Sequence, residues 1–161
     1  MATESSSSGK GDFLNNLGRV LWNLKKFHEA ELKHREALAI HRKILSPNHP
    51  ALAASLEGLA IALQHQRKPA EAEACYYEDL AIRQKVWPDD CTQWQPCLQY
   101  LLDTLGYERK YDEICQLIER LSTPTFLKQP IGKRLTGLLH DRQIRRNQRQ
   151  FRVQFAAKQT L

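Results

Sequence analysis

The stretch LNNLGRVLWNLKKFHEAE at residues 14–31 returns at residues 56–73 as LEGLAIALQHQRKPAEAE, shifted by 42 positions. A third, weaker copy starts 42 positions further on. Leucine recurs at three positions of every copy: Leu14, Leu56 and Leu98; Leu17, Leu59 and Leu101; Leu21, Leu63 and Leu105. A fixed internal period of this length is typical of proteins that stack a small structural unit several times.

Each copy has the pattern of two consecutive helices. The leucines from Leu14 to Leu24 stand three or four positions apart, so they share one face of a first helix. A second helix is expected over residues 27–44, where apolar residues again follow helical spacing. Gly18 on the first helix and Ala30 on the second are small enough to let two backbones approach closely. The pattern therefore predicts a helical hairpin.

Prolines fall where the predicted helices must end or begin. Pro47 follows the second helix and ends it, because proline lacks an amide donor and restricts the residue before it. Pro50 and Pro69 are suited to the first turn of the helices that follow, where a missing donor costs nothing. The sequence predicts an all-α solenoid whose helix pairs span about 12–50, 51–92 and 93–121.

The two ends of the chain differ from the repeats. Residues 1–11 contain a run of serines and are expected to be disordered. Residues 122–130 are predicted to be a connector. Within residues 131–161, apolar positions from Ile131 to Leu139 follow helical spacing. They predict a helix that caps the open end of the stack and continues into a basic tail.

Charged residues on the predicted helices favour solvated faces. Glu31 and Arg35 stand at i and i+4, a spacing that gives modest support to a helix. The acids Glu71, Glu73, Glu78 and Asp79 are expected on a helix surface, opposite lysines and arginines.

The repeat resembles the 42-residue tetratricopeptide repeats of kinesin light chains and of the proteins that share this variant. The likeness covers roughly residues 12–121 and is carried by these stretches: LNNLG at 14–18, KFHEAE at 26–31, REALAI at 35–40, SPNHP at 46–50, KPAEAE at 68–73 and DLAI at 79–82. The resemblance implies a superhelix whose first helices line a concave groove that binds peptides or partner helices. It therefore implies a protein-interaction scaffold or adaptor.

Position by position, the resemblance implies a set of groove residues on the first helices. They are Asn15, Asn16, Arg19, Trp22, Asn23, Glu57, Gly58, Ile61, Gln64, His65, Gln99, Tyr100, Asp103 and Tyr107. The family often uses an asparagine just before the leucine of the first helix to bond the backbone of a bound peptide. This asparagine is present as Asn16 but is replaced by Gly58 and Tyr100 in the later copies, so specificity does not carry over.

The net charge of +6 comes from the C-terminal quarter of the chain. Before residue 125 there are 15 Lys and Arg against 17 Asp and Glu, and from residue 125 onward there are 9 against 1. The basic residues of the tail are Arg142, Arg145, Arg146, Arg149 and Arg152, with two phenylalanines among them. An alternative function is therefore binding of nucleic acid or an acidic partner through this tail. A solubilising tail is a third interpretation.

No residue pattern indicates catalysis or metal binding. No Ser, Cys or Lys combines with His and Asp into a nucleophile and base, and the four cysteines form no CxxC pair. We expect no enzyme activity, cofactor or metal, and structural roles for His34 and His41. The absence of a long apolar run or signal sequence predicts a cytoplasmic protein without a membrane span. Self-association through the open end of the stack remains a further hypothesis.

Overall fold

The computed structural model describes residues 2–88, 90, 92–108, 110–121 and 133. These residues are helical, without a strand among them. The helices are α1 (Ala2–Asn23), α2 (Phe27–Ile44), α3 (Pro50–His65), α4 (Pro69–Val86), α5 (Gln95–Tyr107) and α6 (Tyr111–Leu121). The chain divides into two units, Met1–Lys110 and Tyr111–Leu161, which are described separately. The predicted all-α hairpin repeat is confirmed.

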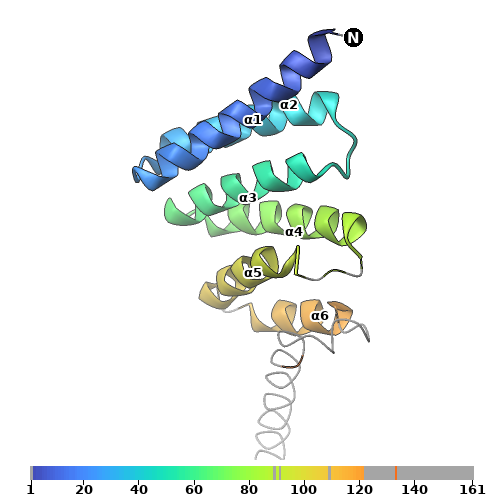
Figure 1. The fold of residues 1–161 in the computed structure, drawn as a ribbon. Coiled ribbons are helices and arrows are strands. Elements are labelled where there is room, and N and C mark those ends of the chain that lie inside the picture. Colours follow the sequence, from blue (N-terminus) through green and yellow to red (C-terminus); the bar gives the residue numbers. More distant parts are fainter. Residues whose placement is uncertain (1, 89, 91, 109, 122–132, 134–161) are drawn as a thin grey trace, which may run out of the picture. The chain divides into compact units, whose positions relative to one another are not determined.

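In the first unit each helix packs against the next one along the chain. The hairpins α1–α2 and α3–α4 are the tightest pairs, and α2 packs against α3 to join them (Figure 1). Helix α5 continues the stack on α4. The first helix of each hairpin therefore lies beside the first helix of the next, and α1 also contacts α3 directly.

The helix ends repeat with the same period as the leucines. Lys25 and Arg67 are 42 positions apart, and both have φ of 60°. Beyond them, the amides of Lys26 and Lys68 donate to the carbonyls of Leu21 and Leu63 at 2.9 and 3.0 Å. This six-residue bond across a left-handed residue is the Schellman motif, which ends a helix and turns the chain back. The amide of Lys110 repeats the bond in the third copy, to Leu105 at 2.9 Å.

Prolines open the later helices as predicted. Pro50 and Pro69 are the first residues of α3 and α4. The His49 side chain caps α3, because its Nδ1 accepts a hydrogen bond from the amide of Ala51 at 3.1 Å. This cap provides a partner for an amide that the helix itself leaves free.

The core of the first unit consists of the recurring leucines and small residues. Ala30, Ala60 and Ala72 have no exposed surface. The leucines that recur with the 42-residue period are buried to 5% exposure or less in α3 and α5, whereas Leu24 of α1 is 63% exposed. Placing Leu24 on the buried face was therefore wrong, because the Leu24 side chain does not turn toward α2 or α3 at the end of its helix.

Helix α1 is longer than expected. It begins at Ala2, which corrects the expectation of a disordered tail over residues 1–11. No proline interrupts this segment, and Gly11 is buried against His41 of α2. Once a helix is anchored in this way, adding further turns costs little free energy.

The described part of the second unit consists of α6 and Lys133. Helix α6 has the bounds predicted for the second helix of the third pair, and Leu117, Ile118 and Leu121 form its buried side. Its pairing with α5 stays a prediction. The predicted connector and the capping helix with its basic tail lie outside the described residues, apart from Lys133.

Candidate binding groove

Side chains of α1, α3 and α5 meet around a cavity of about 410 Å³. It is lined by Asn15, Asn16, Arg19, Trp22, His34, Ala54, Glu57, Gly58, Ile61 and Tyr100. Of the predicted groove residues, eight lie in this set. We call this space the first cavity.

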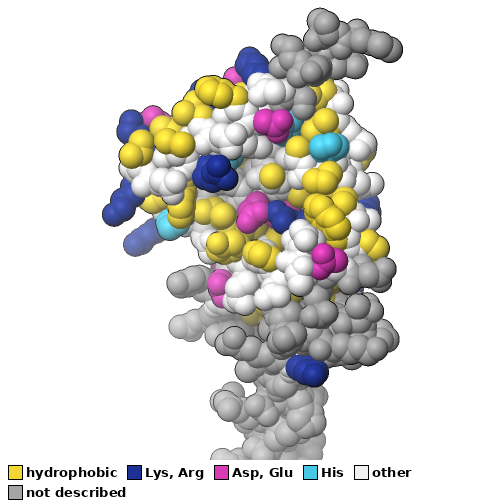
Figure 2. All heavy atoms as spheres, in the orientation of Figure 1, with side chains coloured by type: hydrophobic (Ala, Val, Ile, Leu, Met, Phe, Trp, Pro, Cys, Tyr) yellow, Lys and Arg dark blue, Asp and Glu magenta, His cyan; other side chains and the backbone are white. Residues whose placement is uncertain are grey.

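A second cavity of about 690 Å³ lies further along α3 and α5. It is lined by Gln64, His65, Arg67, Pro69, Tyr100, Asp103 and Thr104. Tyr100 borders both cavities, so we refer to the two together as the groove. Figure 2 shows the molecule from the side on which α1, α3 and α5 lie in front, where apolar side chains alternate with acidic and basic ones.

The apolar wall of the groove is held by stacked rings. His65 of α3 stacks on Phe27 with ring centroids 4.6 Å apart and meets the edge of Trp22 at 5.6 Å. Tyr100 stacks on Tyr76 at 5.8 Å. Because each pair joins residues from different helices, the rings fix the positions of both Trp22 and Tyr100.

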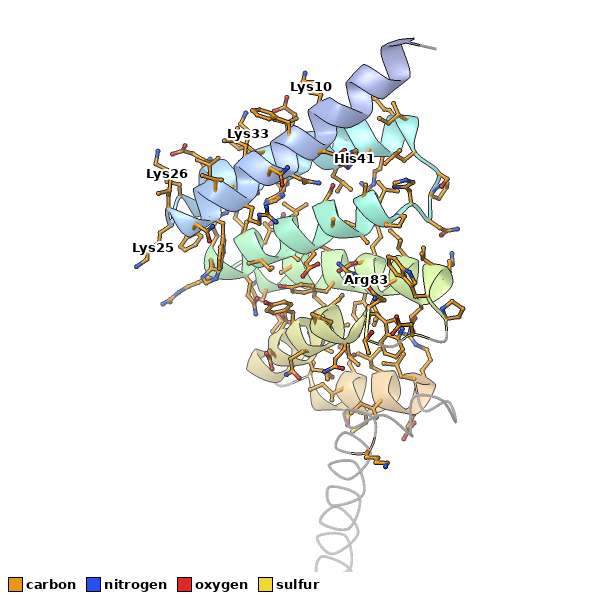
Figure 3. The ribbon with its side chains drawn as sticks, in the orientation of Figure 1. Lys10, Lys25, Lys26, Lys33, His41 and Arg83 are labelled. Atoms are coloured by element: carbon orange, nitrogen blue, oxygen red, sulfur yellow. The ribbon has the colours of Figure 1, made fainter. Side chains whose placement is uncertain are left out.

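The floor of the first cavity is a chain of polar side chains. Asn15 Oδ1 lies 3.1 Å from His34 Nδ1, and Asn15 Nδ2 donates to Ser55 Oγ at 2.7 Å. Ser55 in turn lies 2.9 Å from His41 Nδ1 (Figure 3). Burial lowers the pKa of His34 to about 4, so its ring is neutral at pH 7. A neutral His34 donates from Nδ1 to the Asn15 carbonyl oxygen.

One lining residue of the first cavity, Glu57, belongs to a cluster that is held together by Arg83. Arg83 of α4 donates to Asp79 at 2.6 Å, to the backbone oxygen of Gln93 at 2.9 Å, and to Glu57. Burial raises the pKa of Asp79 to about 6, although the charge of Arg83 opposes the rise. Glu57 therefore faces the first cavity as the partner of a fixed arginine.

This cluster corrects one expectation about the acids. Asp79 is fully buried instead of lying on a solvated surface, and Glu73 is partly buried beside Lys110. Glu71 and Glu78 are exposed as expected. Asp79 turns inward because it stands one helical turn before Arg83, which supplies the opposite charge inside the fold.

Arg19 differs from the other charged groups of the first cavity. Arg19 donates a long hydrogen bond of 3.4 Å to Asn16 Oδ1, and no acid pairs with it among the described residues. Trp22 is similar in one respect, because its indole Nε1 is buried without a hydrogen-bond partner. Of these two residues, the exposed Arg19 leaves donors available at the cavity.

Some predicted residues lie outside both cavities. Asn23 and Gln99 are exposed, and Gln99 donates to Asp103 at 2.9 Å. The side chain of Tyr107 and the arginines Arg142, Arg145, Arg146, Arg149 and Arg152 lie outside the described residues. Whether any groove residue binds a ligand stays a prediction.

Sequence reasoning missed five lining residues, namely His34, Ala54, Arg67, Pro69 and Thr104. His34 belongs to a second helix and reaches the cavity only because Gly18 and Gly58 leave room for its ring. The 42-residue alignment places both glycines on first helices. Small residues at these positions were the sequence signal that another helix packs closely against them.

No helix in the described part of the chain is both long enough and apolar enough to span a membrane. No group of three or more His, Cys, Asp or Glu among the described residues is arranged to hold a metal ion.

Comparison with known proteins gives one family. Residues 11–85 match the family model described as the tetratricopeptide repeat. The match begins within α1, includes α2 and α3, and ends one residue before the end of α4. No curated protein matches the chain.

Proposed function

Because residues 11–85 match the family model of the tetratricopeptide repeat, we propose that the chain is an interaction scaffold that binds a peptide or a partner helix in the groove. Such repeats generally mediate contacts between proteins and carry no catalytic activity of their own. The observation that supports the proposal most is that first helices from three successive copies contribute to one cavity.

The first cavity combines the two kinds of surface that a peptide site needs. Trp22, Ile61 and Tyr100 supply an apolar wall that covers a side chain of the ligand. Asn16 and Arg19 supply amide and guanidinium groups on the same rim. We assign affinity to the apolar wall and orientation to these polar groups.

Arg19 is the residue most suited to discriminate among ligands. A guanidinium without an acid beside it favours a carboxylate or a backbone carbonyl on the bound segment. Glu57 faces the same cavity, and its ion pair with Arg83 offsets part of its negative charge. The first cavity therefore favours a segment that presents an acidic or carbonyl oxygen next to an apolar side chain.

The proposal is tested by capture of partners from a cell extract on the full chain. Proteins that bind in the groove are retained by the wild type and lost when Asn16→Ala and Arg19→Ala are combined. Far-ultraviolet circular dichroism should show equal helicity for the two proteins. Lys43→Ala is the matched control, because it also removes one positive charge from an exposed position of another helix.

Equal capture of proteins by the wild type and the double variant would contradict binding in the groove. Loss of the same proteins from Lys43→Ala would show that charge alone, rather than the groove, retains them.

We also propose that the repeats are of the type found in kinesin light chains, but we do not infer that the chain binds the same cargo. We also keep a cytoplasmic location as an expectation from the sequence. Binding of nucleic acid or acidic proteins through the tail remains the alternative, and it predicts a steep loss of binding with salt that follows the arginines at 142–152.

A further inference from the structure

Helix α1 has an apolar side that faces away from the groove and from α2. Phe13, Leu17, Val20 and Leu24 stand four, three and four positions apart, so they lie along one side of the helix. The exposed fractions of Phe13, Val20 and Leu24 are 65%, 52% and 63%, and Leu17 is partly buried. We call these four residues the end face.

The repeat indicates what kind of surface the end face is. One period later, its first three positions are Ser55, Leu59 and Ala62 of α3, and they are 0%, 5% and 0% exposed. Helix α2 packs on α3, and its His41 bonds Ser55 at 2.9 Å. The end face is therefore the side by which a first helix of this repeat accepts a neighbouring helix.

The side chains of the end face differ in size from those of α3. Phe13 stands where α3 has Ser55, and Val20 stands where α3 has Ala62. Small residues on α3 are matched by large ones on α2, such as His41, because protein interfaces pack to nearly constant density. The large residues of the end face consequently require small residues on the helix that covers them.

Lysines surround the end face. Figure 3 shows Lys10, Lys26 and Lys33 on the side of the α1–α2 hairpin that faces away from α3, and Lys25 in the turn that follows Leu24. Lys26 and Lys33 pair with the exposed Glu29 and Glu36 at 3.2 and 3.3 Å. Lys10 and Lys25 form no ion pair within the described part of the chain.

This charge selects among the helices that could cover the end face. Two copies of the chain that met end face to end face would bring these lysines together, which costs free energy. The segment from residue 125 onward carries nine basic residues and one acid, so it has the same sign. Within residues 9–23 of α1 the one acidic residue is Asp12. Its side chain is 59% exposed, and its carboxylate lies 3.5 Å from Nε2 of His41.

We propose that the end face is a second docking surface, and that it binds a helix of a partner protein with small apolar residues on one side and acidic residues along both flanks. Phe13 and Val20 enter the small-residue side of that helix, while Lys10 and Lys25 pair with its acids. This surface is separate from the groove, so the chain joins two proteins at once.

The test uses the full chain and two designed helical peptides. Both carry alanine on one side; one has glutamates on its flanks and the other has lysines. Fluorescence anisotropy at low salt should give a dissociation constant about tenfold lower for the glutamate peptide, with a difference that shrinks as salt is added. Lys10→Glu combined with Lys25→Glu should reverse the preference.

The apolar contribution is tested with Val20→Gln and Leu24→Gln together. Both positions are at least half exposed, so the fold should be unaffected, and binding of the glutamate peptide should weaken about tenfold. The groove variant Asn16→Ala, Arg19→Ala should bind this peptide like the wild type. This control separates failure of the end face from failure of the groove.

Equal affinity for the two peptides, or affinity that the Val20 and Leu24 changes leave intact, overturns the proposal. Sedimentation that shows a dimer of the chain, lost in the Val20→Gln, Leu24→Gln variant, also overturns it, because a second copy would then be the occupant.

Discussion

Glycines and histidines hold the first hairpin together at the scale of single residues. A Cβ atom on Gly11 would lie 2.2 Å from the His41 ring, and one on Gly18 would lie 2.7 Å from the His34 ring. The glycines are seven positions apart on α1 and the histidines seven apart on α2, so the two pairs repeat along the hairpin. Gly58 of α3 meets the other side of His34.

Gly18→Ala is expected to destabilise the fold by about 1–3 kcal/mol, because the added methyl group overlaps a buried ring that is bonded to Asn15. Urea unfolding measures the change. Gly106→Ala is the matched control, since nothing lies within 4 Å of its Cβ position in α5. Alanine should be neutral or slightly stabilising there, as expected in an open helix position.

His34 also makes stability depend on pH. Its folded pKa of about 4 lies below the unfolded value of about 6.5, so the folded state resists a proton that the unfolded state accepts. The stability is fully present above pH 6.5 and is lost as pH falls toward 4, by about 3 kcal/mol.

The measurement compares the wild type with His34→Gln from pH 7 to pH 4. Glutamine keeps a donor for Asn15 but does not titrate. Asp79, whose folded pKa is raised by burial to about 6, acts in the opposite direction in both proteins and cancels in the difference. A difference in unfolding free energy that stays constant with pH would contradict the assignment.

Buried and exposed ion pairs contribute unequally between helices. Glu31 of α2 is 1% exposed and accepts from Gln66 at 2.7 Å, from Lys68 at 3.0 Å and from Arg35 at 2.6 Å. Burial alone would raise the pKa of Glu31, but these hydrogen bonds and charges hold it below its ordinary value. The contacts join α2 to the turn between α3 and α4.

Glu31→Ala is therefore expected to cost ~2 kcal/mol, because it removes several hydrogen bonds to a buried charge. Glu71→Ala breaks the exposed bridge from α4 to Arg35, which measures 2.7 Å, and should cost at most about 1 kcal/mol. Thermal or urea unfolding of both variants distinguishes them. Similar losses for the two would show that burial does not set their importance.

The repeat period predicted most of the fold, but it did not predict the polar contacts in the interior. Periodicity located the helices because leucines and alanines must be buried on one side of each. It could not show that Glu31 and Asp79 turn inward, because their partners Lys68 and Arg83 are identified only once the helices are packed. The i,i+4 spacing of Glu31 and Arg35 indicated an ion pair but not its burial.

The groove was predicted in outline for a similar reason. A residue on the exposed side of a first helix, such as Ile61, follows from the repeat. His34 does not, because its second helix reaches the cavity only where Gly18 and Gly58 leave space. The extension of α1 to Ala2 was missed because a serine run resembles a linker in composition, although nothing in it stops a helix.

At the scale of the whole molecule, the central claim is that α1, α3 and α5 present one binding groove. Hydroxyl-radical footprinting of the full chain, with and without a captured partner, tests it most directly. The groove predicts that oxidation of Trp22, His65 and Tyr100 falls together on binding, while Phe13 on the end face is unchanged. Unaltered oxidation of these three side chains in the bound state would contradict it.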